Sequence, residues 1–187
     1  AILNAATAGV FVLNAPATTE NYRDLLSQIR VLDPVPAWTA ALTPMPRLKV
    51  APKHQLVDPA IAARLLGLNA HGLLGGIPGA GESLGQLFES LATLCVRADA
   101  ISVDAAVGHL RTRNGDHEVD LVVEDPEARV VGIEVKLARE VEDRDVQHLC
   151  WLRDRIGERF AAGVVLTTGP YAYQRPDGIW VVPLALF

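Results

Sequence analysis

The sequence is poor in cysteine and in aromatic residues. Two of its 187 residues are cysteines, Cys95 and Cys150, and both lie in apolar stretches with helical spacing. Two cysteines cannot form the disulfide framework of a small secreted protein, and these two lack the spacing of a zinc site. With half of its residues hydrophobic and 21% charged, the chain can build the core of one globular domain, with or without a small appendage. We expect the two cysteines to be reduced core residues.

Long apolar runs and an excess of basic residues are also missing. No hydrophobic stretch approaches the roughly 20 residues that cross a bilayer, and there is no secretory signal, so we expect a cytoplasmic protein without a membrane partner. The formal net charge of −5 argues against nucleic-acid binding through overall charge, but it allows a local basic groove. The chain begins at Ala1, and its first residues have no clear period. We therefore expect a fragment trimmed at its N-terminal side.

Residues 76–83, GIPGAGES, lack the lysine of a phosphate-binding loop. The loop pattern is G-x-x-x-x-G-K-[ST], and Glu82 stands at the lysine position, where its charge would repel phosphate. The preceding residues predict a helix and a loop, whereas the motif requires a buried strand. We therefore expect no nucleotide site. The glycines and Pro78 are expected to form a connector, and Ser83 with Gln86 a capping box for the next helix.

The first part of the chain predicts short helices joined by proline-rich connectors. Apolar spacing predicts a helix that is capped at Thr18-Thr19 and includes Ile29. The prolines in residues 31–38 stop this helix and allow only an edge strand. Three further prolines, Pro44, Pro46 and Pro52, predict a connector. It is followed by a short strand over residues 53–57 and by a helix over residues 60–66 that Asp58 caps.

The second part of the chain predicts a mixed sheet flanked by helices. A stripe from Leu84 to Ala98 at spacings of three and four residues indicates a long helix. Alternating hydrophobicity around Asn114-Gly115 then predicts a β-hairpin. Four more elements follow: a strand over residues 129–138, a helix over 143–159, and strands over 161–168 and 178–184. This order, α-β-β-β-α-β-β, predicts an α/β fold.

Acidic and basic side chains recur on two of the predicted strands. Alternation within HEVDLVVE places Asp120 on one face, and within GIEVKLA it places Glu134 and Lys136 together. Two neighbouring carboxylates need a cation, and their hard oxygens favour Mg²⁺ or Mn²⁺. Such an ion activates water and polarises a phosphoryl oxygen, while a lysine orients the water or stabilises the phosphorus. If the strands are neighbours, the pattern predicts metal-dependent phosphodiester hydrolysis.

Simpler interpretations stay open for these residues. A Glu-x-Lys pair in a strand is often an ordinary solvated pair, and an aspartate after a hairpin turn is common. Glu89 favours the site, because it lies beside the apolar stripe of the long helix and can act as an additional acidic ligand or orienting group. Arg111 and Arg113 share one face of the hairpin strand, where either phosphate contacts or solvated strand charges explain them.

Three segments share their order and spacing with a known family: GQLFES (85–90), LRTRNGDHEVDLVVE (110–124) and GIEVKLA (132–138). They resemble the C-terminal domain of a large group of bacterial and archaeal AAA-type ATP-binding proteins, a domain of unknown function related to the PD-(D/E)xK nuclease superfamily. The resemblance also includes residues 18–38 and 53–67, so it covers nearly everything from about residue 17 onward. It implies a restriction-endonuclease-like fold, with a mixed sheet flanked by helices.

The resemblance implies roles for matched positions. Asp120 and Glu134 would hold Mg²⁺ or Mn²⁺, Lys136 would act on the water or the phosphate, and Glu89 would support the metal. Gln147 falls on a helix where some superfamily members have a glutamine that contacts the site. The implied substrate is nucleic acid. A rival interpretation is a nuclease fold kept as a binding or regulatory module whose site no longer turns over; the acidic net charge favours it.

The resemblance also predicts the domain organisation. Residues 1–57 would form a small helical connector like a helix-turn-helix or winged helix, and residues 58–187 the nuclease-like domain. The ATPase domain, with its nucleotide site, would lie upstream and would be a partner; a homo-oligomer is a further expectation. Arg23 and Arg30 suit duplex contact, but an interdomain packing module explains them equally well.

The five histidines show no metal-ligand spacing. His117 and His148 fall near the predicted site. A surface or structural role is the simpler interpretation of both.

Overall fold

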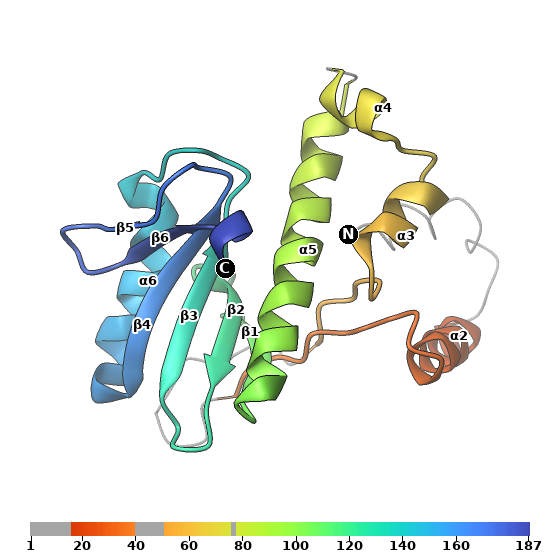
Figure 1. Cartoon of the computed structure of the whole chain (residues 1–187). Coiled ribbons are helices and arrows are strands. Elements are labelled where there is room, and N and C mark those ends of the chain that lie inside the picture. Colours follow the sequence, from red (N-terminus) through yellow and green to blue (C-terminus); the bar gives the residue numbers. More distant parts are fainter. Residues whose placement is uncertain (1–15, 40–50, 76–77) are drawn as a thin grey trace. The chain divides into compact units, whose positions relative to one another are not determined.

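The computed structural model describes residues 16–39, 51–75 and 78–187 (Figure 1). The chain forms two compact units, Ala1–Val35 with Lys53–Leu94, and Pro36–Pro52 with Cys95–Phe187. Pro44 and Pro46 of the predicted connector, and Gly76 and Ile77 of the glycine-rich stretch, lie outside the described residues. The division into residues 1–57 and 58–187 stays a prediction.

The first unit contains short helices and one pair of extended segments. Its helices are α2 (Pro16–Gln28), α3 (Pro59–Leu65), α4 (Ala70–Leu74) and the larger part of α5 (Ala80–Ser102). The extended segments meet antiparallel at two isolated bridges, Leu32 with Leu56 and Val35 with Lys53. The predicted strand over residues 53–57 is therefore wrong as a regular strand, although Leu32 and Val35, which form the bridges, are both buried.

Helix capping in this unit follows one prediction and contradicts two. Asp58 caps α3 as expected, and its Oδ1 accepts a hydrogen bond of 2.7 Å from the Ala60 N–H. Helix α2, however, already begins at Pro16, so Thr18 and Thr19 lie inside it; proline at a helix start has the required φ and needs no N–H partner.

Ser83 does not cap α5, because the helix begins three residues earlier, at Ala80. The Ser83 N–H instead donates to the carbonyl oxygen of Gly79 at 3.1 Å, which is a helical hydrogen bond. Gly79 has a φ of +82°, a conformation that glycine adopts without strain, so it can turn the chain into the helix. The glycine-rich stretch thus contributes the start of α5 itself.

Helix α5 forms as predicted, but its buried side differs from the predicted stripe. Leu87, Ala92, Val96 and Ala100 are buried, whereas Leu91 is 41% exposed. Alanines contribute little to a hydrophobic pattern even though they allow close packing. The predicted stripe followed the large leucines, so it placed the buried face of the helix incorrectly.

The second unit contains a six-stranded mixed sheet, and its fold is α/β as predicted. The strands are β1 (Ala106–Arg111), β2 (Glu118–Glu124), β3 (Val130–Val135), β4 (Phe160–Thr167), β5 (Tyr173–Gln174) and β6 (Trp180–Pro183), in the spatial order β1-β2-β3-β4-β6-β5. Strands β3, β4 and β6 are parallel, and the remaining neighbours are antiparallel. The two-residue strand β5 was not predicted, because two exposed residues carry no period.

The hairpin of β1 and β2 turns at Asn114-Gly115 as expected, and Gly115 has a φ of +79°. The Thr112 N–H closes the loop by donating to the His117 carbonyl oxygen at 2.9 Å. On the other edge of β1, the Trp38 N–H donates to the His109 carbonyl oxygen at 2.7 Å. The predicted edge strand of residues 31–38 therefore occurs only as isolated bridges.

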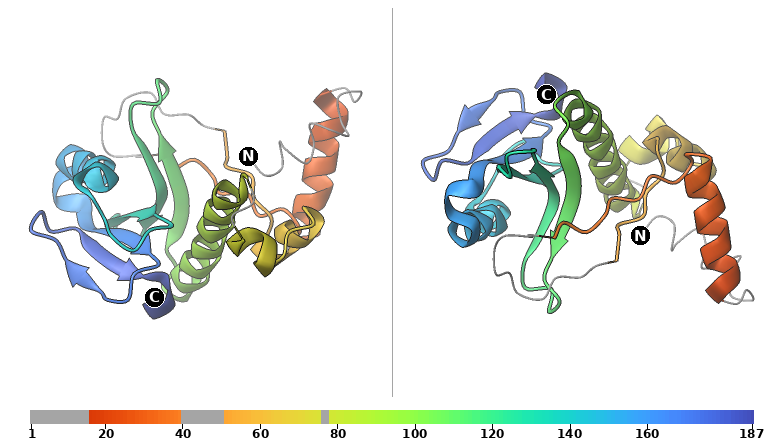
Figure 2. Two further views of the ribbon diagram at one scale, coloured as in Figure 1. Left: turned by 90° about the horizontal axis from the view of Figure 1, so that it is seen from above. Right: turned by 90° about the horizontal axis from the view of Figure 1, so that it is seen from below.

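Helix α6 (Asp143–Ile156) connects β3 to β4 and lies along one face of the sheet (Figures 1 and 2). It ends three residues before the predicted end, because Gly157 has a φ of +59° and begins a 3₁₀ turn, Gly157–Arg159. Leu149 and Leu152 are fully buried between the helix and the sheet. They lie over Gly132 of β3, where an added Cβ would come within 3.0 and 3.2 Å of their methyl groups.

Cys95 on α5 and Cys150 on α6 are free thiols, as the sequence predicts, but both are half-buried rather than fully buried core residues. In the part of the chain that the structure describes, no helix combines the length and the apolar character needed to cross a membrane.

Candidate functional site

The candidate site is built on the ends of β2 and β3. These strands are antiparallel, with Val122 opposite Gly132 and Leu121 opposite Ile133. Continuing this register by one residue places Asp120 opposite Glu134, and strand alternation puts the Glu134 side chain on the face that carries Gly132, which α6 covers through Leu149 and Leu152. The pairing of β2 with β1 shifts register between Val122 and Val119, so alternation does not place Asp120, but its charge acts on the pKa of Glu134 and of His148 on α6.

Backbone hydrogen bonds hold the acidic and basic residues in register. The Val135 N–H donates to Asp120 Oδ2 at 2.9 Å, so β3 itself fixes the aspartate. The Lys136 N–H donates to the Leu166 carbonyl oxygen at 2.9 Å and extends the pairing of β3 with β4 by one residue. The Lys136 Nζ then lies 3.1 Å from Glu134 Oε2. The structure therefore brings Asp120, Glu134 and Lys136 together.

Glu134 occupies an unfavourable electrostatic environment. Its side chain is 4% exposed, and within the part of the chain that the structure describes no N–H or O–H group donates to its buried Oε1. Burial, together with the neighbouring Asp120 carboxylate, raises the pKa of Glu134 from 4.5 to about 8, even though Lys136 opposes the shift. Burial alone would lower the pKa of Lys136, but the charges of Glu134 and Asp120 outweigh it and raise that pKa. The cluster thus contains two carboxylates, the buried Glu134 and the half-buried Asp120, against the single cation Lys136.

This arrangement fits a hard divalent cation. An unpartnered carboxylate oxygen beside a second carboxylate is what such an ion would neutralise. No group of three or more His, Cys, Asp or Glu residues with metal-binding geometry occurs among residues 16–39, 51–75 and 78–187. Asp120 and Glu134 would thus provide two ligands, which suits Mg²⁺, because this ion keeps several waters and often takes further ligands from substrate phosphates.

Glu89 belongs to the first unit, whereas Asp120, Glu134 and Lys136 belong to the second. Its Oε1 forms an ion pair with Lys53 Nζ at 3.3 Å, and its carbonyl oxygen accepts a hydrogen bond from Thr93 Oγ1 at 2.8 Å. Lys53 was not foreseen as its partner, since residues 36 apart carry no sequence signal of contact. The role of Glu89 as a supporting group stays a prediction.

The predicted substrate-binding residues differ in their surroundings. Arg111 on β1 pairs with Glu118 across the hairpin, with 3.4 Å between Nε and Oε2, as expected for a strand charge pair. Arg113 was predicted on the strand but lies in the exposed hairpin loop, because β1 ends at Arg111. Gln147 is an exposed residue of α6. The roles of all three in binding stay predictions.

On α6, Asp145 and His148, rather than Gln147, interact electrostatically with the cluster, and Asp145 contributes to the raised pKa of Lys136. Burial, and then the charges of His117 and Lys136, lower the pKa of His148, while Glu118 and Asp120 act in the opposite direction. His117 Nδ1 and His148 Nδ1 are 3.3 Å apart. The spacing of His148, Trp151 and Arg155, at i, i+3 and i+7 on one face of a helix, was a signal that sequence reasoning did not use.

Comparison with protein families gives two matches. Residues 3–72 match the family described as "Domain of unknown function (DUF8612)". Residues 84–187, more than half of the chain and all of the sheet, match the family described as "Domain of unknown function (DUF4143)". A comparison with curated proteins gives no match. The DUF4143 domain is found in AAA-ATPase-associated proteins. By this match, the chain belongs to the DUF4143 family.

Proposed function

We propose that the sheet unit is a metal-dependent nuclease domain that hydrolyses phosphodiester bonds of nucleic acids. One observation carries this proposal: the buried and unpartnered Oε1 of Glu134 lies in a cluster with Asp120 and Lys136. A buried carboxyl group with a pKa of about 8 lowers the stability of the folded protein at neutral pH and above, so stability alone does not explain its presence. Strongly perturbed acidic groups of this kind concentrate at functional sites.

Each side chain of the cluster has a separate role in the proposed hydrolysis. Asp120 and Glu134 would hold the cation, and the Val135 N–H keeps Asp120 oriented. Bound there, Mg²⁺ or Mn²⁺ would supply Lewis acidity toward a phosphoryl oxygen and lower the pKa of a bound water. Lys136 donates hydrogen bonds to the attacking water or to a non-bridging phosphate oxygen, where negative charge accumulates in the transition state. The extension of the β3–β4 pairing fixes the Lys136 backbone for this role.

The finer assignment of the fold belongs to the same proposal. Three antiparallel strands followed by a helix and a parallel strand, with a Glu-x-Lys at the end of the third strand, support a PD-(D/E)xK or restriction-endonuclease-like fold. The residues before α3 would then be the helical, winged-helix-like connector. The association of DUF4143 domains with AAA ATPases supports an ATPase domain as a partner in a longer protein.

A second function is supported by a different feature of the cluster. Lys136 pairs with Glu134 at 3.1 Å, and the chain carries 22 acidic against 17 basic residues. A lysine that already neutralises the carboxylate suits a fold that binds nucleic acid or protein without cleaving it. The alternative is therefore a catalytically silent regulatory module of the ATPase.

Nuclease assays with matched variants separate the two functions. The protein is incubated with end-labelled DNA and RNA in Mg²⁺, in Mn²⁺ and in EDTA, alongside Asp120→Asn and Lys136→Ala. We expect metal-dependent cleavage by the parent and a loss of about 100-fold or more in each variant, because each removes a group that acts on the transition state. Glu127→Ala is the control, since it removes an exposed carboxylate of the turn between β2 and β3.

Two results would count against catalysis. If the parent cleaves nothing in either metal while it still binds the labelled strands, the silent module is the better assignment. If Asp120→Asn and Lys136→Ala cleave as fast as Glu127→Ala, the activity does not come from this cluster.

A further inference from the structure

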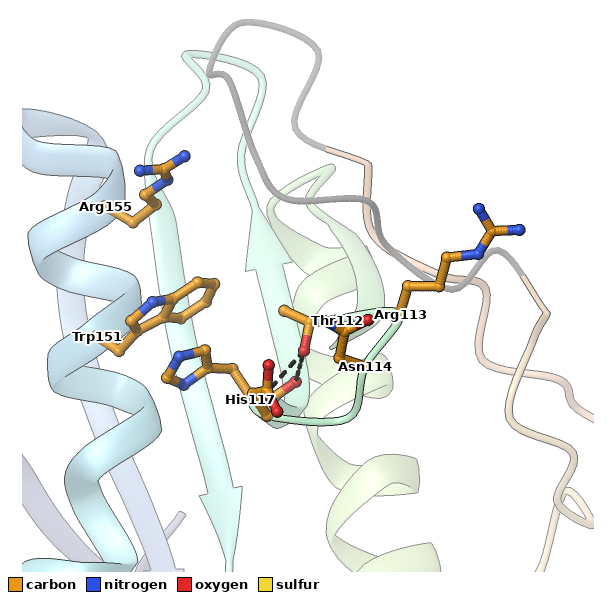
Figure 3. Close-up of a pocket in the computed structure, with 7 residues that line it drawn as sticks. Thr112, Arg113, Asn114, His117, Trp151 and Arg155 are labelled. Carbon is orange, nitrogen blue, oxygen red and sulfur yellow. Dashed lines mark hydrogen bonds between the residues drawn. The ribbon is translucent and has the colours of Figure 1, made fainter.

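An open pocket of about 560 Å³ lies between the β1–β2 hairpin and α6 (Figure 3). The hairpin lines it with Thr112, Asn114, Asp116 and His117, and the helix lines it with Trp151 and Arg155. Arg113 also lines it, but in Figure 3 its side chain points away from Trp151. The volume lies within the range of small-ligand sites, and nothing in the proposed hydrolysis so far uses these residues.

A stack of aromatic rings forms one wall of this pocket. The rings of His117 and Trp151 lie nearly parallel, with centroids 4.1 Å apart and an interplanar angle of 11°. His148 meets His117 edge-on, with centroids 5.5 Å apart. Trp151 is half-buried, and Leu149 and Leu152 beside it are fixed in the core. The stack is therefore held in place before any ligand arrives.

The stack connects the pocket to the acidic cluster. His148 is close enough to Lys136 and Asp120 for both charges to affect its pKa. His117 follows the hairpin turn directly before β2 and stands three residues before Asp120 in the chain. A polymer bound at the cluster can thus place its neighbouring unit at the His117–Trp151 stack.

The polar groups of the pocket select a class of ligand. Arg155, one helical turn after Trp151, offers an exposed guanidinium that suits a phosphate. Asn114 and Asp116 offer an amide and a carboxylate, which suit the donors and acceptors on the edge of a base. The Asp116 charge disfavours a bare polyphosphate or a second phosphate nearby. A flat ring with polar edges and a single phosphate matches all these groups.

We propose that this pocket binds an unpaired nucleotide of the nucleic-acid substrate, with its base added to the His117–Trp151 stack and its phosphate on Arg155. The proposal rests on the proposed nuclease function for the identity of the polymer. It adds that the substrate is single-stranded at the bound position, because a paired base cannot leave its own stack to enter the pocket without the cost of unpairing.

Equilibrium binding in EDTA tests the pocket without requiring cleavage. Fluorescence anisotropy compares a labelled oligo-dT strand about 12 nucleotides long with a blunt hairpin duplex of similar length. We expect the parent to bind the single strand more tightly than the duplex. Arg155→Ala and Trp151→Leu should each weaken single-strand binding by at least about fivefold, since each removes a phosphate or stacking contact. Arg129→Ala, an exposed arginine of the turn between β2 and β3, should bind as the parent does.

The outcomes separate this inference from the proposed function. Binding that depends on Arg155 in a protein that cleaves nothing supports the pocket and refutes the nuclease. Cleavage by a protein whose Arg155→Ala variant binds the single strand normally refutes the pocket and leaves the nuclease in place. Equal affinity for duplex and single strand also overturns the pocket. Because Arg155 is exposed, its variant remains a valid test even if Trp151→Leu disturbs packing.

Discussion

At the scale of single residues, Glu134 combines three properties that rarely occur together. It is buried, one of its oxygens has no partner, and a second carboxylate lies on the neighbouring strand. Lys136 compensates part of this charge, but the pKa of Glu134 still rises to about 8 through burial and the Asp120 charge. Near neutral pH the folded, metal-free protein therefore keeps the Glu134 carboxyl protonated, whereas in the unfolded chain this carboxyl has lost its proton.

This proton makes the stability of the metal-free protein depend on pH. Below its ordinary pKa of 4.5, Glu134 is protonated in both states; between 4.5 and about 8 only the folded state keeps the proton. The free energy of unfolding should therefore fall as pH rises through this window, by at most about 1.4 kcal/mol per pH unit, and level off above it. Urea unfolding in EDTA at several pH values measures the slope.

Glu134→Gln provides the comparison, because a neutral amide of the same shape has no proton to lose. Other titrating groups, including His148, whose pKa is lowered, also make the free energy of unfolding depend on pH, and they are present in both proteins. The difference between parent and variant isolates Glu134. If both proteins show the same pH dependence, Glu134 does not carry the raised pKa, and the main support for a metal site is lost.

The sequence predicted which residues form this cluster but not the state of Glu134. Strand alternation predicted that Glu134 and Lys136 share a face, since a period of two fixes the direction of a side chain. It does not place Asp120, because β2 shifts register beside that residue, and the hydrogen bond from the Val135 N–H orients the aspartate instead. Burial of Glu134 depends on how closely α6 packs on β3, which involves leucines 15 and more residues away in the chain. For the same reason, the His117–Trp151 stack and the ion pair between Glu89 and Lys53 were not foreseen.

At the scale of elements, the contact between α6 and the sheet determines the depth of the site. Leu149 and Leu152 approach the sheet at Gly132, where a Cβ would stand 3.0 and 3.2 Å from their methyl groups. Gly132→Ala should therefore push α6 away from β3 and destabilise the sheet unit by about 1–3 kcal/mol, as overpacked cores do. Tryptophan fluorescence during urea unfolding reports this unit, because Trp38, Trp151 and Trp180 all belong to it.

Gly85→Ala is the matched control, because no atom lies within 4 Å of the position of its added Cβ. In the interior of α5 this change should be neutral or stabilising, by up to about 1 kcal/mol. If Gly132→Ala unfolds at the same urea concentration as the parent, α6 has room to adjust, and the burial of Glu134 has another cause.

Element order and element ends were predictable to different degrees. The long helix, the hairpin, β3, α6 and β4 follow from strong periods and from one turn signal, Asn114-Gly115. The errors occur where one local signal competes with another: Pro16 starts α2 ahead of Thr18, and Gly79 precedes a helix that begins before Ser83. A capping residue identifies a helix start only if no earlier residue can also begin the helix.

At the scale of the whole molecule, charge limits how the protein can bind nucleic acid. The chain has 17 basic and 22 acidic residues, so its overall field repels a polyanion. The proposed contacts use Lys136 at the cluster and Arg155 in the pocket. Such a protein has to bind through a few local contacts rather than through a continuous basic surface.

The salt dependence of binding should reflect this small number of contacts. Each phosphate neutralised by a cation contributes about −0.7 to −0.9 to the slope of log K against log salt, so we expect a slope between about −1 and −3. The measurement is the anisotropy titration with oligo-dT in EDTA, repeated from low to physiological salt, and Arg155→Ala should reduce the slope by about one unit. A slope of about −6 or steeper would mean that many more cations contact the strand than the cluster and the pocket provide, and that the main nucleic-acid surface lies elsewhere on the molecule.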